Sequence, residues 1–219
     1  MCGRFTLSQS PEAIAEAFAL TAPPAVEPRY NIAPTQDVLT VRATAEGRSA
    51  IAVRWGLVPS WSKDPAIGAR MINARAETVA EKPSFRSALR SRRCLVVADG
   101  FYEWKKVEGK KQPYHIRLVD SEVFAFAGLW ERSGKAGEEL ETCTIITTAA
   151  NELMIGIHER MPVILETADY ERWLDPGEQQ AEAVLPLLHP YSSSKMVAFP
   201  VSTLVNSPSQ DKPELINSL

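Results

Sequence analysis

Short apolar segments separated by turn residues run through most of this chain, and they constrain its fold more than any other feature. Six of these segments are predicted as strands: 38–41, 50–55, 94–98, 114–118, 124–129 and 143–147. The first two flank the turn-prone pair Glu46-Gly47 and indicate a hairpin. The segment 94–98 ends at Asp99-Gly100 and resumes at 101–104, as in a buried strand interrupted by a bend or bulge. Strands in such succession favour a largely antiparallel sheet.

Helical periodicity is confined to shorter parts of the sequence. Ser10 followed by Pro11 predicts a helix over 11–20. Further helices are expected at 84–89, 151–157, 168–174 and 178–188. The proline-rich stretch 22–34 is expected to be an ordered loop. Because strands outnumber helices, we predict an α+β fold, a single domain over 1–219 on a largely antiparallel sheet or open β-barrel with peripheral helices.

Composition excludes several classes of protein. The chain of 219 residues is 45% hydrophobic and 23% charged, which excludes a wholly disordered or collagen-like protein. No apolar stretch approaches roughly 18 residues and no basic, apolar leader opens the sequence, so we expect a cytoplasmic protein without a membrane partner. Three His and three Cys residues show no ligand spacing, and phosphate-loop and dinucleotide motifs are missing from the sequence. We therefore expect no metal and no cofactor.

The charge distribution bears on nucleic acid as a partner. A net charge of −3 argues against a protein that coats nucleic acid by bulk electrostatics. Arginines nevertheless cluster between 70 and 93, while acidic residues collect at 138–141 and 166–182. Such asymmetry is compatible with one positive face, and equally with an ordinary solvated surface.

Cys2 offers the most distinctive chemistry. Removal of Met1 would leave Cys2 at the N-terminus, with an amine of pKa about 7.7–8.0 and a thiol of pKa about 8.5 on adjacent carbons. The amine can form a Schiff base with an aldehyde, which the thiol can trap as a five-membered thiazolidine. Taken alone, Cys2 also fits a frayed terminus. Cys94 and Cys143 lie in apolar strands and are expected to be buried, inert thiols.

Three other positions carry polar groups suited to a reaction site. In extended backbone, Asn73 and Arg75 point to the same side, which suits a sugar oxygen and a phosphate, although a structural Asn beside an exposed Arg has the same pattern. Glu103 stands between Tyr102 and Trp104, where it is either desolvated and suited to proton transfer or turned to solvent. His158 follows a predicted helix, in a loop where it can act as an acid or base or be merely structural.

Six sequence blocks together resemble one known family. They are MCGRF at 1–5, YNIAP at 30–34, WGLVP at 55–59, INARAE at 72–77, DGFYEW at 99–104 and IHERMP at 157–162. Their order and spread over nearly the whole chain are similar to those of the SOS-response-associated peptidase family. This resemblance implies an enzyme that senses abasic sites in single-stranded DNA and crosslinks to them covalently, with lyase-type Schiff-base chemistry.

The resemblance also implies roles for individual residues. Cys2 would attack the aldehyde of the opened sugar, Asn73 would position the sugar, Glu103 would shuttle protons, and His158 would assist ring opening and the reverse reaction. The implied DNA contacts are Arg4, Arg75 and Arg160 to phosphates and Pro34, Trp61 and Trp104 to bases, with Arg86 as a looser extension. Trp61, in a loop of Pro and Ser, suits stacking on a base or ordinary surface packing.

Two other functions stay open at this point. The family name records a peptidase activity, so the same residues are compatible with a cysteine-type peptidase or self-processing peptidase. A non-covalent module that binds single-stranded DNA is the third possibility. In each DNA-binding case we expect a monomer whose partner is single-stranded DNA, associated with the nucleoid when bound.

Overall fold

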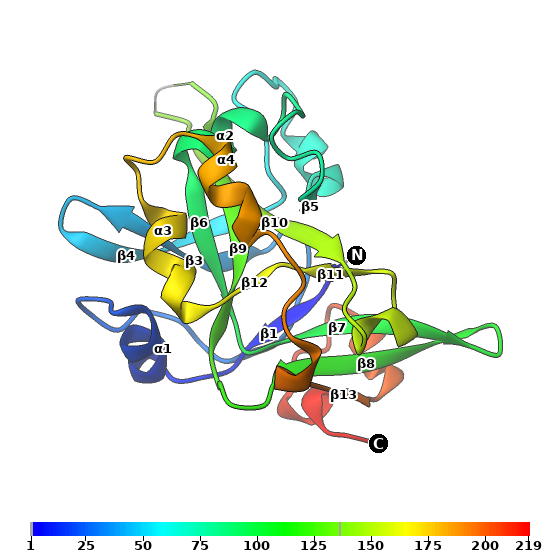
Figure 1. Cartoon of the computed structure of the whole chain (residues 1–219). Coiled ribbons are helices and arrows are strands. Elements are labelled where there is room, and N and C mark those ends of the chain that lie inside the picture. Colours follow the sequence, from blue (N-terminus) through cyan, green and yellow to red (C-terminus); the bar gives the residue numbers. More distant parts are fainter. Residues whose placement is uncertain (1, 136) are drawn as a thin grey trace.

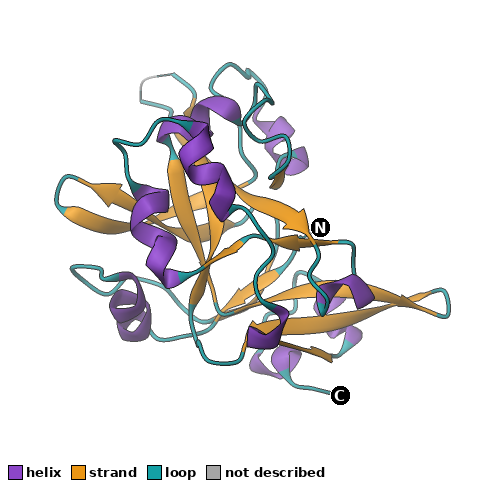
Figure 2. Cartoon of the chain, viewed as in Figure 1, coloured by secondary structure: helices purple, strands orange, loops and turns teal. Residues whose placement is uncertain are grey.

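The computed structural model describes residues 2–135 and 137–219, and its strands form two sheets flanked by short helices (Figures 1 and 2). The strands are β1 Phe5–Leu7, β2 Arg29–Ile32, β3 Asp37–Thr44, β4 Gly47–Trp55, β5 Asn73–Arg75, β6 Arg93–Ala98, β7 Gly100–Val107, β8 Lys110–Leu118, β9 Phe124–Ser133, β10 Leu140–Ala149, β11 Arg160–Pro162, β12 Ile164–Leu165 and β13 Met196–Pro200. The α-helices are α1 Pro11–Phe18, α2 Arg86–Ser91, α3 Tyr170–Leu174 and α4 Ala181–Val184. The predicted α+β class is confirmed.

The first sheet has the strand order β13-β8-β7-β1-β2, and neighbouring strands in it are antiparallel. Its longest pairing is the β7–β8 hairpin, which extends from Phe101 opposite Ile116 to Val107 opposite Lys110. β1 joins β7 through Phe5 opposite Phe101, so the start of the chain runs along the inner end of this hairpin.

The second sheet closes on itself as a ring. Its order is β11-β10-β4-β3-β6-β9-β12, and β10 also pairs with β9. β10 pairs parallel with β4 and with β5, and antiparallel with β9 and with β11. Because β5 and β11 both meet β10 near Thr147, the segments around Asn73 and Arg160 lie on either side of one strand.

Aromatic packing joins the two sheets. The ring of Phe5 from β1 lies 5.2 Å from that of Trp55 in β4 and 5.8 Å from that of Phe126 in β9, in edge-on contacts. All three side chains are fully buried. Since buried aromatic pairs add to the stability gained from their apolar area, Phe5 fixes the N-terminal strand at the joint between the sheets.

The structure corrects the predicted course of residues 94–104. A bend is present, but β6 belongs to the ring-like sheet and β7 to the other, so the chain changes sheets at Asp99. The Asp99 carboxylate accepts hydrogen bonds from the hydroxyl groups of Thr6 and Ser8, which ties β1 to this crossing. An ideal Cβ on Gly100 would lie 2.9 Å from Thr6 Oγ1, so only glycine fits this close approach.

Several predicted elements differ in extent. The hairpin of β3 and β4 and the helix α1 are confirmed, whereas α2 begins two residues later than the predicted 84–89. The 151–157 helix is wrong, because only one 3₁₀ turn forms at Met154–Gly156. The 178–188 helix is limited to α4 and a further 3₁₀ turn, since Pro186 lacks the N–H that would continue it. The 22–34 loop contains β2.

Candidate active site

Cys2 lies in the interior of the protein rather than at a frayed end. It is fully buried, and its carbonyl oxygen accepts a hydrogen bond of 2.7 Å from Asn73 Nδ2. Asn73 is held in place because β5 pairs with β10, Ile145 lying opposite Asn73. The Asn73 Oδ1 atom is buried and accepts no hydrogen bond within the described residues, so it remains available to a donor that enters the site. The frayed-terminus interpretation of Cys2 is therefore wrong.

Burial controls the thiol of Cys2. Loss of solvent raises its pKa far above the usual range, and the nearby Glu103 carboxylate raises it further. The backbone N–H of Arg4 lowers the pKa, but this is a smaller effect. In the folded chain, burial therefore favours the protonated form of the thiol. Cys94 and Cys143 are buried, as predicted.

Glu103 is turned inward. Its side chain is 3% exposed on β7, which rejects the alternative that strand alternation points it to solvent. The N–H of Tyr102 donates to the carbonyl of Arg4 over 2.9 Å and so holds the segment after Cys2 along β7. This pairing explains how a residue more than a hundred positions away reaches the thiol electrostatically.

A pocket of about 520 Å³ opens at Glu103. It is lined by Glu103, Trp104, Lys111, His158 and Asn206. His158 Nδ1 accepts a 3.0 Å hydrogen bond from the backbone N–H of Arg160. An imidazole that accepts at Nδ1 carries its proton on Nε2 when neutral, so His158 can offer a donor at Nε2. The pocket therefore combines a carboxylate, an imidazole and an aromatic ring.

Arg4 is held at the edge of the site by the C-terminal part of the chain. Its Nη1 atom donates to Asn31 Oδ1 over 2.7 Å and to the carbonyl of Val205 over 2.8 Å. Burial lowers the pKa of the guanidinium, which also lies 6.0 Å from the centre of the Trp104 ring. Trp104 Nε1 in turn donates to Asn206 Oδ1 over 2.7 Å, so both side chains have fixed orientations.

Arg160 forms a second cationic position. Its two terminal nitrogens bind the two carboxylate oxygens of Glu77 at 2.6 and 3.0 Å, and Nη2 also donates to the carbonyl of Thr147. The Arg160 side chain is 12% exposed, whereas that of Glu77 is 50% exposed. Hydrogen bonding from Arg160 lowers the pKa of Glu77, and the charge of Arg75 lowers it further. The two terminal nitrogens of Arg160 form a fork of donors that can also bind a phosphate, and the exposed Glu77 carboxylate occupies that fork here.

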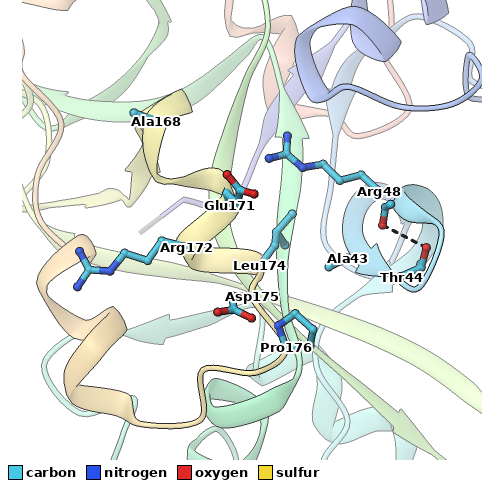
Figure 3. Close-up of a pocket in the computed structure, with 10 residues that line it drawn as sticks. Ala43, Thr44, Arg48, Ala168, Glu171, Arg172, Leu174, Asp175 and Pro176 are labelled. Atoms are coloured by element: carbon cyan, nitrogen blue, oxygen red, sulfur yellow. Dashed lines mark hydrogen bonds between the residues drawn. The ribbon is translucent and has the colours of Figure 1, made fainter.

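The remaining predicted residues lie outside this pocket. Trp61 is 59% exposed and lines another hollow, of about 760 Å³, with Lys63 and Lys135. Arg86 is exposed at the start of α2, and Pro34 is half-buried in the loop after β2. The pocket drawn in Figure 3, between the β3–β4 turn and α3, contains none of the predicted site residues.

Two of the arginines between 70 and 93 are engaged within the fold. Arg93 is buried, and it donates to the main-chain carbonyls of Leu89 and Trp173. Arg92 forms an ion pair with Glu131 at 2.9 Å. These two guanidinium groups stabilise the fold, so the positive charge near the site comes from other residues.

Three residues of the site were missed by the sequence reasoning. Glu77 was quoted only as the end of a motif, although a carboxylate two residues after Arg75 is a natural partner for a cation. Asn206 and Lys111 line the pocket from distant segments. The available signal for Lys111 was the pair of lysine doublets around Gly109, which no structural role required.

Comparison with known proteins agrees with this arrangement. The family described as SOS response associated peptidase (SRAP) matches residues 1–208. The chain is 48% identical to abasic site processing protein YoqW of Bacillus subtilis over 223 residues, covering 100% of both chains. It is 35% identical to abasic site processing protein YedK of Escherichia coli over 180 residues, covering 80% of this chain and 79% of that protein. A crystal structure of a Bacteroides thetaiotaomicron protein superposes with a TM-score of 0.87 at 29% identity, covering 100% of both chains.

Among residues 2–135 and 137–219, no group of three or more His, Cys, Asp and Glu side chains is placed to hold a metal ion. Within the same residues, none of the helices has the length and apolar character needed to cross a membrane.

Proposed function

The chain belongs to the SOS response associated peptidase family, and on this premise we propose that it captures abasic sites in single-stranded DNA through Cys2. The observation that carries the proposal is the buried Cys2, held by Asn73 at its carbonyl and facing the charge of Glu103. Relatives named abasic site processing proteins support the choice of substrate. The product would be a covalent thiazolidine, formed after removal of Met1.

In the proposed order of steps, the α-amine reacts first and the thiol second. The free α-amine of Cys2 attacks the aldehyde carbon C1′ of the opened sugar, and loss of one water gives the Schiff base. The sulfur then bonds to C1′ while its proton is transferred to the imine nitrogen, which closes the five-membered ring. Glu103 can accept the proton from sulfur and return one to nitrogen, so it serves as the proton shuttle of this step.

Asn73 and His158 have supporting roles in the proposal. Asn73 holds the main chain of Cys2 and leaves its buried Oδ1 for a sugar hydroxyl. His158, with its proton on Nε2, assists opening of the sugar ring and, in the reverse direction, release of the adduct. A Schiff base at C1′ also acidifies the neighbouring C2′ hydrogens, so fast ring closure protects the strand from β-elimination.

The proposed DNA contacts include residues near the pocket and residues elsewhere on the surface. Arg4, Arg75 and Arg160 would hold phosphates, while Trp104 and the more distant Pro34 and Trp61 would contact bases; Arg86 would make a peripheral contact. An abasic nucleotide has no base to extrude, so capture avoids the unstacking cost of a few kcal/mol that base-flipping enzymes incur. We propose that residues 1–219 form one domain, which acts as a monomer in the cytoplasm and is associated with the nucleoid when it is bound to DNA.

The decisive experiment compares two N-termini of one protein. A cleavable extension ahead of Cys2 keeps its nitrogen in a peptide bond, and protease treatment releases the amine without another change. Incubated with an abasic oligonucleotide, the cleaved protein should gain the mass of the oligonucleotide less one water, and the uncleaved protein should not.

The same samples separate the alternatives. Adduct formed equally by the uncleaved protein would refute the amine mechanism. Binding without any adduct on a denaturing gel, unaffected by Cys2→Ser, would support a non-covalent module. Cleavage of peptide substrates by a protein whose amine is acetylated would favour the peptidase instead.

A further inference from the structure

The outer half of the β7–β8 hairpin projects from the molecule. β1 pairs with β7 only as far out as Phe101, and β13 pairs with β8 only as far out as Tyr114. Beyond these positions, within the described residues, each hairpin strand has the other as its sole partner in the sheet. Figure 1 shows the resulting ribbon extending past the body of the protein, away from α1.

This ribbon is strongly basic. Residues 105–112 contain four lysines and one acidic residue, Glu108, which gives a charge of +3 in a chain whose total is −3. The lysines are Lys105, Lys106, Lys110 and Lys111. Lys106, Lys110 and Lys111 are exposed, and none of the four forms an ion pair with any residue of the described chain. Their charges are therefore available to an external partner.

The register divides the lysines between two faces. Lys106 lies directly opposite Lys111, so their side chains share one face of the ribbon. Alternation along β7 puts Trp104 on this face too. Glu103 and Lys105 lie on the other face, together with Lys110, which pairs with Val107. Trp104 and Lys111 both line the pocket that contains Glu103 and His158. The face with Lys106 and Lys111 is thus connected to the candidate pocket through Trp104 and Lys111, although Glu103 enters the pocket from the other face of the strand.

A like-charged pair at directly opposite positions destabilises a hairpin. Packing gives no compensation here, because both lysines are exposed. The sugar-phosphate backbone of DNA is the partner that would turn this repulsion into attraction, since each ammonium group can then pair with a phosphate of the strand.

We propose that the β7–β8 hairpin is a phosphate-binding arm, in which Lys106 and Lys111 hold the DNA strand on one side of the abasic nucleotide. Four residues of each strand at roughly 3.3 Å per residue give the arm a reach of about 13 Å beyond the pocket. This inference rests on the proposed function and adds to it the path by which the strand leaves the site. Lysines suit such a contact because they act as point charges that tolerate a variable backbone.

The test uses a single-stranded oligonucleotide with a central tetrahydrofuran nucleotide, an abasic analogue without an aldehyde. Non-covalent affinity is measured against salt for wild type, for Lys106→Gln with Lys111→Gln, and for the matched control Lys105→Gln with Lys110→Gln. Losing two phosphate contacts should lower the slope of log affinity against log salt by about 1.4, at roughly 0.7 per contact. Between 50 and 200 mM salt, wild type should then lose about sevenfold more affinity than the first variant.

The control pair removes the same charge from the opposite face and should change the slope by less than half as much. Equal effects of the two pairs would mean that only net charge matters, and an unchanged slope in the first pair would mean that no phosphate is bound. Either result overturns the proposal that the hairpin is a phosphate-binding arm. Thermal unfolding of each variant verifies that these substitutions leave the fold intact.

Oligonucleotides truncated on one side of the analogue locate the strand. The difference between wild type and the Lys106/Lys111 variant should disappear when one flank is removed and persist when the other is. Persistence with both truncations would contradict an arm that follows one flank. Because the analogue cannot be captured, failure of the arm is distinguishable from failure of covalent capture, which only a true abasic aldehyde reports.

Discussion

Replacing Glu77 by Gln should strengthen DNA binding, although it removes an ion pair. In the free protein the Glu77 carboxylate occupies both terminal nitrogens of Arg160, at 2.6 and 3.0 Å. An incoming phosphate needs the same fork of donors. Arg160 is proposed to bind a phosphate, so it must first give up Glu77. The glutamate is half-exposed and can turn away, whereas Arg160 is fixed by its bond to Thr147.

The size of the effect follows from this exposure. A surface ion pair of good geometry contributes about 0.5–1 kcal/mol after solvent screening. Glu77→Gln makes that free energy available to the phosphate, so affinity should rise about two- to fivefold, at 1.36 kcal/mol per factor of ten. Folding stability should fall by the same amount. The variant thus exchanges stability for binding, with opposite signs in two measurements.

Two assays check these signs. Fluorescence anisotropy with the tetrahydrofuran oligonucleotide, in a Cys2→Ala background, measures affinity without covalent capture. Urea unfolding measures stability. Because the folded pKa of Glu77 is depressed, the stability contributed by the pair is present above the unfolded pKa of about 4.3 and is lost as the pH falls through the lower folded value. The stability difference between wild type and variant should therefore be seen at pH 7 and should vanish in acid.

Glu81→Gln is the matched control. Glu81 is exposed four residues further along and, among the described ion pairs, is not a partner of Arg160. The Glu81→Gln substitution removes the same charge without releasing the guanidinium of Arg160, so the DNA affinity of this variant should change little. An equal rise in DNA affinity for both variants would mean that only the loss of one negative charge matters. Unchanged or weaker binding by Glu77→Gln would refute the idea that this carboxylate competes with DNA.

Three further predictions concern the site and its support. Asn73→Ala removes the donor to the Cys2 carbonyl and should slow adduct formation about two- to tenfold, the cost of one hydrogen bond, in a single-turnover gel assay. Gly100→Ala should destabilise the fold by about 1–3 kcal/mol in urea, because a Cβ would collide with the buried His115 ring and Thr6. Burial, with a smaller effect from Arg117, lowers the pKa of His115 to about 3, so stability is full above the unfolded value of about 6.5 and is lost on acidification. The loss between pH 7 and 5 should be about 2 kcal/mol in wild type and smaller in His115→Gln.

Local features of the sequence predicted the longer elements of the fold. The β3–β4 hairpin has its turn and its apolar alternation within one continuous segment, and its register confirms the prediction. β5 has only three residues, too few for any periodicity, and it exists because β10 offers backbone partners some seventy residues away. Short strands of this kind are products of tertiary pairing, and composition alone does not predict them.

The site shows the same division. Residue type and motif marked Cys2, Asn73, Glu103 and His158, but not the contacts that orient them. Arg4 bonds to the carbonyl of Val205 across 201 positions, and Arg160 bonds to Glu77 across 83. The raised pKa of the thiol could not be predicted from the sequence either, because the burial of a residue so near the chain start depends on the packing of Phe5 between two sheets.

The joint between the sheets explains how one residue near the chain start can be both buried and reactive. Phe5 is enclosed by aromatic rings of the ring-like sheet, and three residues earlier Cys2 is drawn into the same joint. β7 leaves that joint carrying Glu103 and continues outward as the lysine ribbon. The strand that supplies the proposed proton shuttle is therefore the strand that supplies the proposed phosphate arm. Displacing β7 should impair capture and binding together, whereas Lys106→Gln, in the ribbon and outside the pocket, should impair only binding.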